Sequence, residues 1–217
     1  MPEGTDFLYP FIEGDERDAG PLLLDLARSA VGKHEVSVTL RTATLSAAGS
    51  TLNATSRAMA DAFAAGGGLF SFGNGGSATD AASLAALFSR PPSGRALPAR
   101  SLADDPAVLT ALANDVGFDL VFSRQLIAHA SAGDIAVGLS TSGSSRNVLT
   151  AFAEARRRGM VTVGLAGYDG GEMVTSADLQ HCLVVGSDSV HRIQEVQAAV
   201  AFALWEALQQ RLEHDDG

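Results

Sequence analysis

From residue 68 onward, short and mainly apolar runs alternate with longer segments of helical periodicity, and this alternation constrains the fold more than any other feature. The apolar runs lie at 68–73, 96–103, 134–141, 161–167 and 181–186. Runs without polar alternation are typical of strands buried on both faces, as in a parallel sheet covered by helices. Since helical segments separate these runs, the sequence predicts a doubly wound α/β sandwich of about five strands.

The first third of the chain has a different character. Residues 1–20 are acidic and contain Pro2 and Pro10, so we expect an N-terminal arm and not a secretion signal. No internal repeat or low-complexity linker divides the remainder. We therefore expect residues 21–213 to form a single domain whose N-terminal part is a helical appendage.

Two helices are predicted in this appendage. Leu22, Leu23 and Leu26 recur at helical spacing. Because such a stripe left in water would be an unusual apolar patch, we expect it to join copies of the chain. A second helix is expected to begin near Asn53 or Thr55 and to end at the three consecutive glycines that follow.

Composition excludes several classes of function. The 217 residues carry a formal net charge of −10, which argues against direct nucleic-acid binding because such binding depends on Lys and Arg. Cys182 is the one cysteine, so an intramolecular disulfide and a multi-cysteine metal site are excluded. No apolar run approaches the roughly 18 residues that a membrane span requires. We therefore expect a cytoplasmic protein with no membrane contact.

A glycine-rich turn follows the first apolar run. In "GNGGS", residues 73–77, the glycines permit positive φ angles and a close backbone approach. Ser77 offers a hydroxyl group and is a candidate cap for the helix that follows. This turn lacks the spacing of the dinucleotide-binding fingerprint G-x-G-x-x-G. The Walker motif G-K-[ST] does not occur anywhere in the sequence. On its own, such a turn is as often a tight connection as a binding loop.

A serine-rich turn follows the third apolar run. "STSGSSRN", residues 140–147, places five hydroxyl groups around Gly143, directly before a predicted helix. The positive end of a helix dipole and its exposed amides favour an anion. With no lysine nearby, these donors suit one tetrahedral phosphate monoester. Because the carboxyl ends of parallel strands lie at one edge of a sheet, we expect both turns to belong to one site.

Four motifs, in the same order, resemble the sugar isomerase (SIS) domain family and, within it, the phosphoheptose isomerase branch. They are "GNGGSATDA", "STSGSSRNVL", "GYDGGEM" and "RIQEV", and "VLTALANDVGFDLVFSRQ" at 108–125 adds a further match. The resemblance covers residues 20–212. It implies a three-layer α/β/α sandwich with a five-stranded parallel sheet, and a homotetramer with sites shared between subunits. It also implies a phosphorylated sugar as ligand, typically sedoheptulose 7-phosphate.

The resemblance further implies which residues hold the sugar phosphate. By their positions in the motifs, the phosphosugar-binding residues are Asn74, Ser77, Ser140, Thr141, Ser142, Ser145 and Gln194. Gln194 matches a residue that, in the family, reaches the substrate or a bound zinc ion. The binding half of the site is therefore expected to be intact.

The catalytic half of the family's site is replaced. In the family, a Glu and a His move the proton between C1 and C2, and together with a second His they bind zinc where it is present. Here Leu87 stands at the Glu position, Phe202 at the His position and Ser83 at the position of the second His. Gln197 replaces the His of "RIQEVH". Because Leu and Phe neither transfer protons nor bind metals, we expect no zinc ion and no other cofactor.

Other residues are candidates for a missing base. His191, at the start of the last predicted helix, is the first candidate for a catalytic residue. Asp104, Asp105 and Asp115 lie in segments from which one carboxylate could approach the ligand. Asp80 belongs to the first motif and is expected to cap or brace the first turn of its helix.

Two functions therefore stay open at this point. The chain is either a phosphosugar-binding protein that acts through a regulatory protein partner, or a divergent isomerase that uses a different base. Both require the two turns to form a binding site. Replacement of both proton-transfer residues favours the first function.

Overall fold

The computed structural model describes residues 20–215, and these residues belong to two compact units. The first unit ends at Val38 and the second begins at Thr39. Of the arm predicted at 1–20, residues 1–19 lie outside the described part of the chain. No described helix is long and apolar enough to cross a membrane.

The helix predicted from the leucine stripe is present. α1 (Gly20–Ala47) is continuous through the stripe, and Leu22, Leu23 and Leu26 are all exposed on it. Their role in joining copies of the chain stays a prediction.

The second helix begins earlier than the sequence predicted. α2 (Gly49–Ala64) starts several residues before Asn53 and Thr55, without a side-chain cap. The Thr55 hydroxyl donates to the carbonyl of Thr51 at 2.7 Å, so it bonds back into the helix and does not cap it. The helix ends as expected near the glycines, where Gly66 has a φ of +88°.

The sheet has the predicted architecture. Its five strands are all parallel and lie in the order β2-β1-β3-β4-β5. They are β1 (Leu69–Gly73), β2 (Ala99–Ser101), β3 (Ile135–Ser140), β4 (Val161–Gly167) and β5 (His181–Val185). β2 is much shorter than the predicted run at 96–103. Pro98 has no N–H to donate, and the N–H of Leu97 bonds the carbonyl of Phe88 instead of a neighbouring strand.

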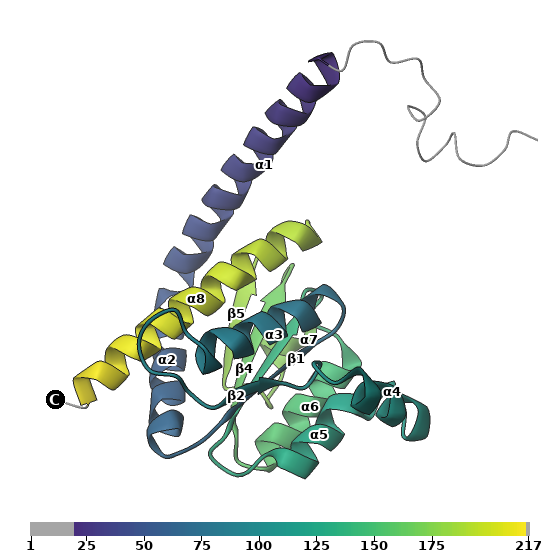
Figure 1. The fold of residues 1–217 in the computed structure, drawn as a ribbon, viewed down its shortest axis with the longest axis vertical. Helices are drawn as coiled ribbons and strands as arrows, with labels where there is room; N and C mark the ends of the chain where they lie inside the picture. Colours follow the sequence, from purple (N-terminus) through teal and green to yellow (C-terminus); the bar gives the residue numbers. More distant parts are fainter. Residues whose placement is uncertain (1–19, 216–217) are drawn as a thin grey trace, which may run out of the picture. The chain divides into compact units, whose positions relative to one another are not determined.

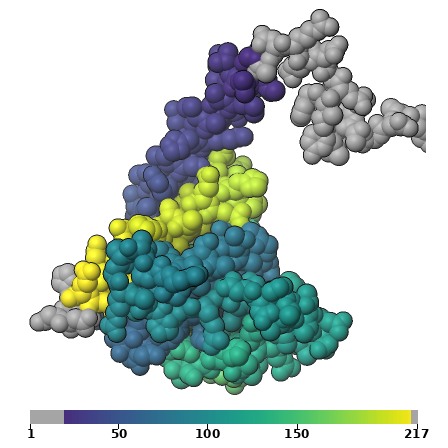
Figure 2. Space-filling model, in the orientation of Figure 1, coloured from purple at the N-terminus to yellow at the C-terminus, as the bar shows by residue number. Residues whose placement is uncertain are grey.

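Helices cover both faces of the sheet, which gives the three predicted layers (Figure 1). One apolar cluster joins the sheet to α2, α3 (Gly76–Ser89) and α8 (Val190–Asp215). A second cluster joins the other face to α5 (Val121–His129), α6 (Arg146–Arg157) and α7 (Gly171–Thr175). In the space-filling view, α8, in yellow, lies directly against the blue-teal surface formed by α3 and the loop after it (Figure 2). 

The segment between β2 and β3 is divided into three short helical elements. It forms α4 (Pro106–Asp115), a short 3₁₀ turn at Phe118–Leu120, and α5. Asp105 caps α4 by accepting hydrogen bonds from the N–H groups of Ala107 and Val108. Gly117, with a φ of +99°, adopts a backbone conformation that interrupts the helical path.

The strand order places the two unusual turns side by side. From β1 the chain crosses to β2 on one side, whereas β3 lies on the other side of β1. The register pairs Gly73 at the end of β1 with Leu139, one residue before the end of β3. The turns after β1 and β3 therefore flank the point where the winding of the sheet reverses, which is where parallel α/β folds bind ligands.

Candidate functional site

The turn after β1 has a backbone that only glycine can supply. A Cβ on Gly73 would lie 2.6 Å from the carbonyl oxygen of Ser77 and 2.9 Å from that of Leu139. Gly75, with a φ of +54°, is the N-cap residue of α3 and makes no side-chain cap bond. The prediction that Ser77 caps the helix is therefore wrong. Ser77 lies inside the first turn, is 5% exposed, and its N–H bonds the carbonyl of Asn74 at 3.0 Å.

The serine-rich turn after β3 forms a connected cluster of hydroxyl groups. The Oγ of Ser140 lies 2.9 Å from the Oγ of Ser145 and 3.3 Å from that of Ser142. Ser145 is the N-cap residue of α6, but its hydroxyl bonds Ser140 and not the backbone of the helix. Ser140 is buried while Ser142 is exposed, so the cluster extends from the sheet to the surface. Such a chain of hydroxyls at a helix N-terminus can donate to the oxygens of a phosphate.

The first residues of α7, which follows β4, support the serine-rich turn. The N–H of Met173 donates to the carbonyl of Gly143 at 2.9 Å, and the N–H of Glu172 donates to the Oγ of Ser144 at 3.2 Å. A Cβ on Gly171 would overlap the carbonyl oxygen of Ser142. This contact explains the motif "GYDGGEM", to which sequence reasoning assigned no role. The paired glycines are the signal that a close backbone approach is needed there.

Two side-chain amides hold the turns together. Asn74 and Asn147 exchange two hydrogen bonds, each 2.8 Å long, between their amide groups. Asn147 is buried at the start of α6, and sequence reasoning did not single it out. Asn74, predicted to lie near the sugar, is therefore also the brace between the two turns.

A second side-chain pair joins α8 to α3 at the same edge of the sheet. The Nε2 of Gln194 donates to Oδ2 of Asp80 at 3.2 Å. Burial raises the pKa of the Asp80 carboxyl above its ordinary value, and the hydrogen bond from Gln194 offsets part of that rise. Asp80 does not cap α3, so the brace that it provides runs between two helices.

The start of α8 is fixed against the serine-rich turn as well. A Cβ on Gly167, at the end of β4, would lie 2.6 Å from both the side chain of Ile193 and the carbonyl oxygen of Thr141. Because Ile193 is the neighbour of Gln194 in the chain, this packing places Gln194 at the same edge as Thr141. All seven predicted phosphosugar-binding residues thus come from the carboxyl edge of the sheet or the start of α8.

The positions that the resemblance assigns to the family's catalytic residues carry no carboxylate or imidazole. Ser83 is exposed on α3, and Leu87 is half-buried and packs against the core cluster. Phe202 is 44% exposed and packs on Trp205, with the two ring centroids 5.3 Å apart. Gln197 is fully buried.

The residues present do not fit a zinc ion of the family's type. Leu87 and Phe202 have no donor atom, and of the family's zinc-ligand positions only Gln194 keeps its residue. In the part of the chain that the structure describes, no group of three or more His, Cys, Asp or Glu residues could hold a metal ion.

The structure places the candidates for a substitute base in different surroundings. His191 is exposed in the first turn of α8, three residues from Gln194. Asp105 already accepts two hydrogen bonds as the cap of α4, and Asp115 accepts one from Asn114 at 2.8 Å. Asp104 is exposed before α4. Of these candidates, His191 is the one that lies close along the chain to a predicted ligand residue.

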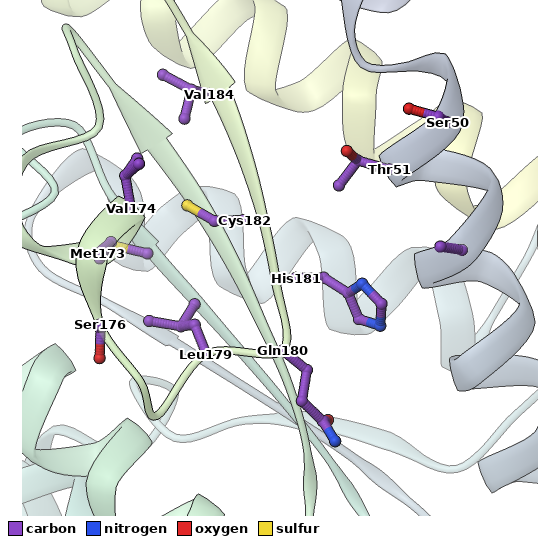
Figure 3. Close-up of a pocket in the computed structure, with 11 residues that line it drawn as sticks. Ser50, Thr51, Met173, Val174, Ser176, Leu179, Gln180, His181, Cys182 and Val184 are labelled. Atoms are coloured by element: carbon purple, nitrogen blue, oxygen red, sulfur yellow. The ribbon is translucent and has the colours of Figure 1, made fainter.

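A hollow along β5 is separate from these residues. Figure 3 shows it between the start of α2 and α7, with His181 and Cys182 on opposite faces of the strand, and its volume is about 480 Å³. Burial lowers the pKa of His181 and raises that of the Cys182 thiol to about 11. None of the predicted phosphosugar-binding residues lines this hollow.

The parallel five-stranded sheet with a glycine-rich and a serine-rich turn at its switch point is the architecture of a SIS domain. The model of the SIS domain family matches residues 34–167, and the chain belongs to this family. Within the family, the chain is phosphoheptose isomerase-like. 

Relatives and solved structures agree on this branch. The phosphoheptose isomerase of Paramagnetospirillum magneticum is 47% identical over 154 residues, which cover 68% of this chain and 77% of that protein. The phosphoheptose isomerase of Roseiflexus is 40% identical over 187 residues, covering 85% and 94% of the two chains. The structure of phosphoheptose isomerase from Neisseria gonorrhoeae superposes with a TM-score of 0.78 at 32% identity, covering 85% of this chain and 99% of that one.

Proposed function

We propose that this protein binds a phosphorylated sugar at the two turns and does not isomerise it. The observation that carries the proposal is the contrast within one site. The hydroxyl cluster at Ser140, Ser142 and Ser145 is connected and in place, whereas Leu87 and Phe202 occupy the two positions from which the family transfers protons.

Two features support phosphate binding. The cluster stands at the N-terminus of α6, where unpaired backbone amides and the helix dipole stabilise negative charge. The start of α7, at Gly171 and Met173, and the Asn74–Asn147 pair hold the turns in position before any ligand arrives. Such preorganisation reduces the entropy that binding must offset.

The proposed loss of turnover follows from the rate enhancement that the two missing proton-transfer groups would supply. General acid–base groups contribute on the order of 10²–10⁴-fold each to enzymatic rates. Replacement of both groups therefore removes most of the rate advantage of an isomerase.

A protein that binds a ligand without converting it acts by changing the equilibrium of another process, such as its binding to a partner protein. Ligand binding and partner binding are then coupled, and the coupling is reciprocal. We therefore include a regulatory protein partner in the proposal.

We also propose that the protein assembles into a homotetramer. The exposed leucine stripe at Leu22, Leu23 and Leu26 of α1 supports this assembly.

One experiment tests both halves of the proposal. Purified protein is titrated with sedoheptulose 7-phosphate by calorimetry and is then incubated with it in deuterium oxide, with and without added zinc. NMR follows the exchange of the C1 proton with solvent. We expect measurable binding without exchange above background.

A second candidate function is a divergent isomerase, and the identity of 47% to a phosphoheptose isomerase favours it. Exchange at an ordinary enzymatic rate of about 1 s⁻¹ or more would establish this function in place of the first. His191→Ala is then the first variant to make, because His191 is the exposed imidazole nearest in the chain to Gln194. Loss of exchange in that variant would identify the substitute base.

A further inference from the structure

The two ends of the Gln194 amide have different surroundings. Its nitrogen donates to Oδ2 of Asp80 at 3.2 Å. Its oxygen accepts no hydrogen bond from any residue in the described part of the chain, and it is not among the atoms sealed away from solvent. The nitrogen of the amide is therefore paired within the protein, and the oxygen is available to accept a hydrogen bond from a ligand.

Asp80 determines which end of the amide is available. A glutamine amide can rotate by half a turn about its last bond, which exchanges its donor and acceptor ends. An ionised carboxylate only accepts hydrogen bonds, so it pairs with the NH₂ end alone. Rotation of the amide would bring two oxygen atoms to 3.2 Å from each other without a hydrogen between them.

Gly76 makes this arrangement sterically possible. A Cβ at position 76 would overlap the amide nitrogen of Gln194 and would lie 3.1 Å from its oxygen. Because position 76 has no side chain, the amide lies directly over the first turn of α3. Ser77, a predicted phosphate ligand, is the next residue in that turn.

We propose that Asp80 is a positioning residue that fixes the Gln194 amide with its oxygen toward the ligand. The site then selects a phosphorylated polyol or sugar that offers a hydroxyl donor to this oxygen, in preference to a phosphate without such a hydroxyl. The inference rests on the proposed function, because it concerns the sugar-facing half of the same site.

The test compares two ligands in a double-mutant cycle. Affinities for sedoheptulose 7-phosphate and for inorganic phosphate are measured by calorimetry on the wild type, Asp80→Ala, Gln194→Ala and the double variant. One neutral hydrogen bond corresponds to about a three- to tenfold change in affinity. We expect Asp80→Ala to reduce the preference for the sugar phosphate over inorganic phosphate by up to this factor. In the Gln194→Ala background, removal of Asp80 is expected to change the preference no further.

Matched measurements separate positioning from a structural effect. Glu154→Ala removes a carboxylate that pairs with Arg158 at 2.7 Å near the end of α6 away from the serine-rich turn, and we expect it to leave the preference unchanged. Thermal unfolding is measured for every variant, because a purely structural role of Asp80 would lower the melting temperature without changing the ratio of the two affinities.

The outcomes distinguish this inference from the function on which it rests. If the wild type binds neither ligand, the proposed function and this inference both fail. If the wild type binds the sugar phosphate but the effects of Asp80→Ala and Gln194→Ala on the preference are independent, the inference alone is overturned. Coupled effects on the preference support it.

Discussion

Two buried glutamines on α8 provide a matched pair for measuring the cost of an unpaired amide. Gln197 is 0% exposed, and neither its Nε2 nor its Oε1 has a hydrogen-bond partner within the described residues. Gln209 is 6% exposed, and its amide accepts from the N–H of Arg95 at 2.9 Å and donates to the carbonyl of Arg95 at 2.8 Å. The two side chains are of the same type, lie on the same helix and are both buried, but only one of them is paired.

We predict that Gln197→Met stabilises the fold and that Gln209→Met destabilises it. A buried amide without a partner costs roughly 1–3 kcal/mol, and a side chain of the same shape without polar atoms removes that cost. For a chain of this length, each kcal/mol corresponds to about 2–4 °C in Tm. Gln197→Met should therefore raise Tm by several degrees, whereas Gln209→Met removes two hydrogen bonds and should lower it.

Thermal and urea unfolding of the two variants and the wild type measure these changes directly. All three proteins are compared at one protein concentration, because assembly of copies would shift the apparent stability. If Gln197→Met destabilises the protein as much as Gln209→Met does, the reasoning is refuted. A buried water molecule would then pair with Gln197, and its loss would account for the change.

The remaining predictions concern the site, the cysteine and assembly. Ser142→Ala should weaken binding of sedoheptulose 7-phosphate about tenfold or more, since a hydrogen bond to a charged group contributes roughly 1.5–3 kcal/mol; calorimetry that finds the same affinity would contradict a role for the serine-rich turn. Because the pKa of Cys182 is raised to about 11 from 9.0, its thiolate fraction at pH 8 should be about a hundredth of that in the unfolded chain, and iodoacetamide should react correspondingly slowly. The same shift means that the contribution of this thiol to stability is complete below pH 9 and is lost as the pH rises toward 11, which urea unfolding of the wild type and Cys182→Ala can measure. Leu23→Glu in the exposed stripe of α1 should reduce the mass found by light scattering at micromolar concentration, and an unchanged mass would exclude this stripe from the interface.

The sequence by itself determined the class of fold and the place of the site. Mainly apolar runs identified all five strands, because strands of a parallel sheet that helices cover on both faces favour apolar side chains on both faces. The glycines of 73–76 and the serines of 140–145 identified the two turns, since positive φ angles and clustered hydroxyls are local properties of the chain. These features depend on neighbours in the sequence, so they can be recognised there.

Element boundaries were less well determined, because they depend on competition between local alternatives. Thr55 is a residue type that caps helices, yet its hydroxyl bonds the carbonyl of Thr51 and the helix continues past it. Ser77 likewise lies inside α3, because Gly75 adopts the conformation that begins the helix. The sequence permits either arrangement at both positions, and packing against the sheet selects one.

Only the tertiary structure decided which side chains pair across the site. Asn74 and Asn147 are 73 residues apart, and Asp80 and Gln194 are 114 apart, yet each pair forms a direct hydrogen bond. The same holds for Gln197, whose burial without a partner cannot be distinguished in the sequence from the paired burial of Gln209. A side-chain hydrogen bond extends only about 3 Å, so its partner is fixed by how the helices and strands pack and not by the order of residues along the chain.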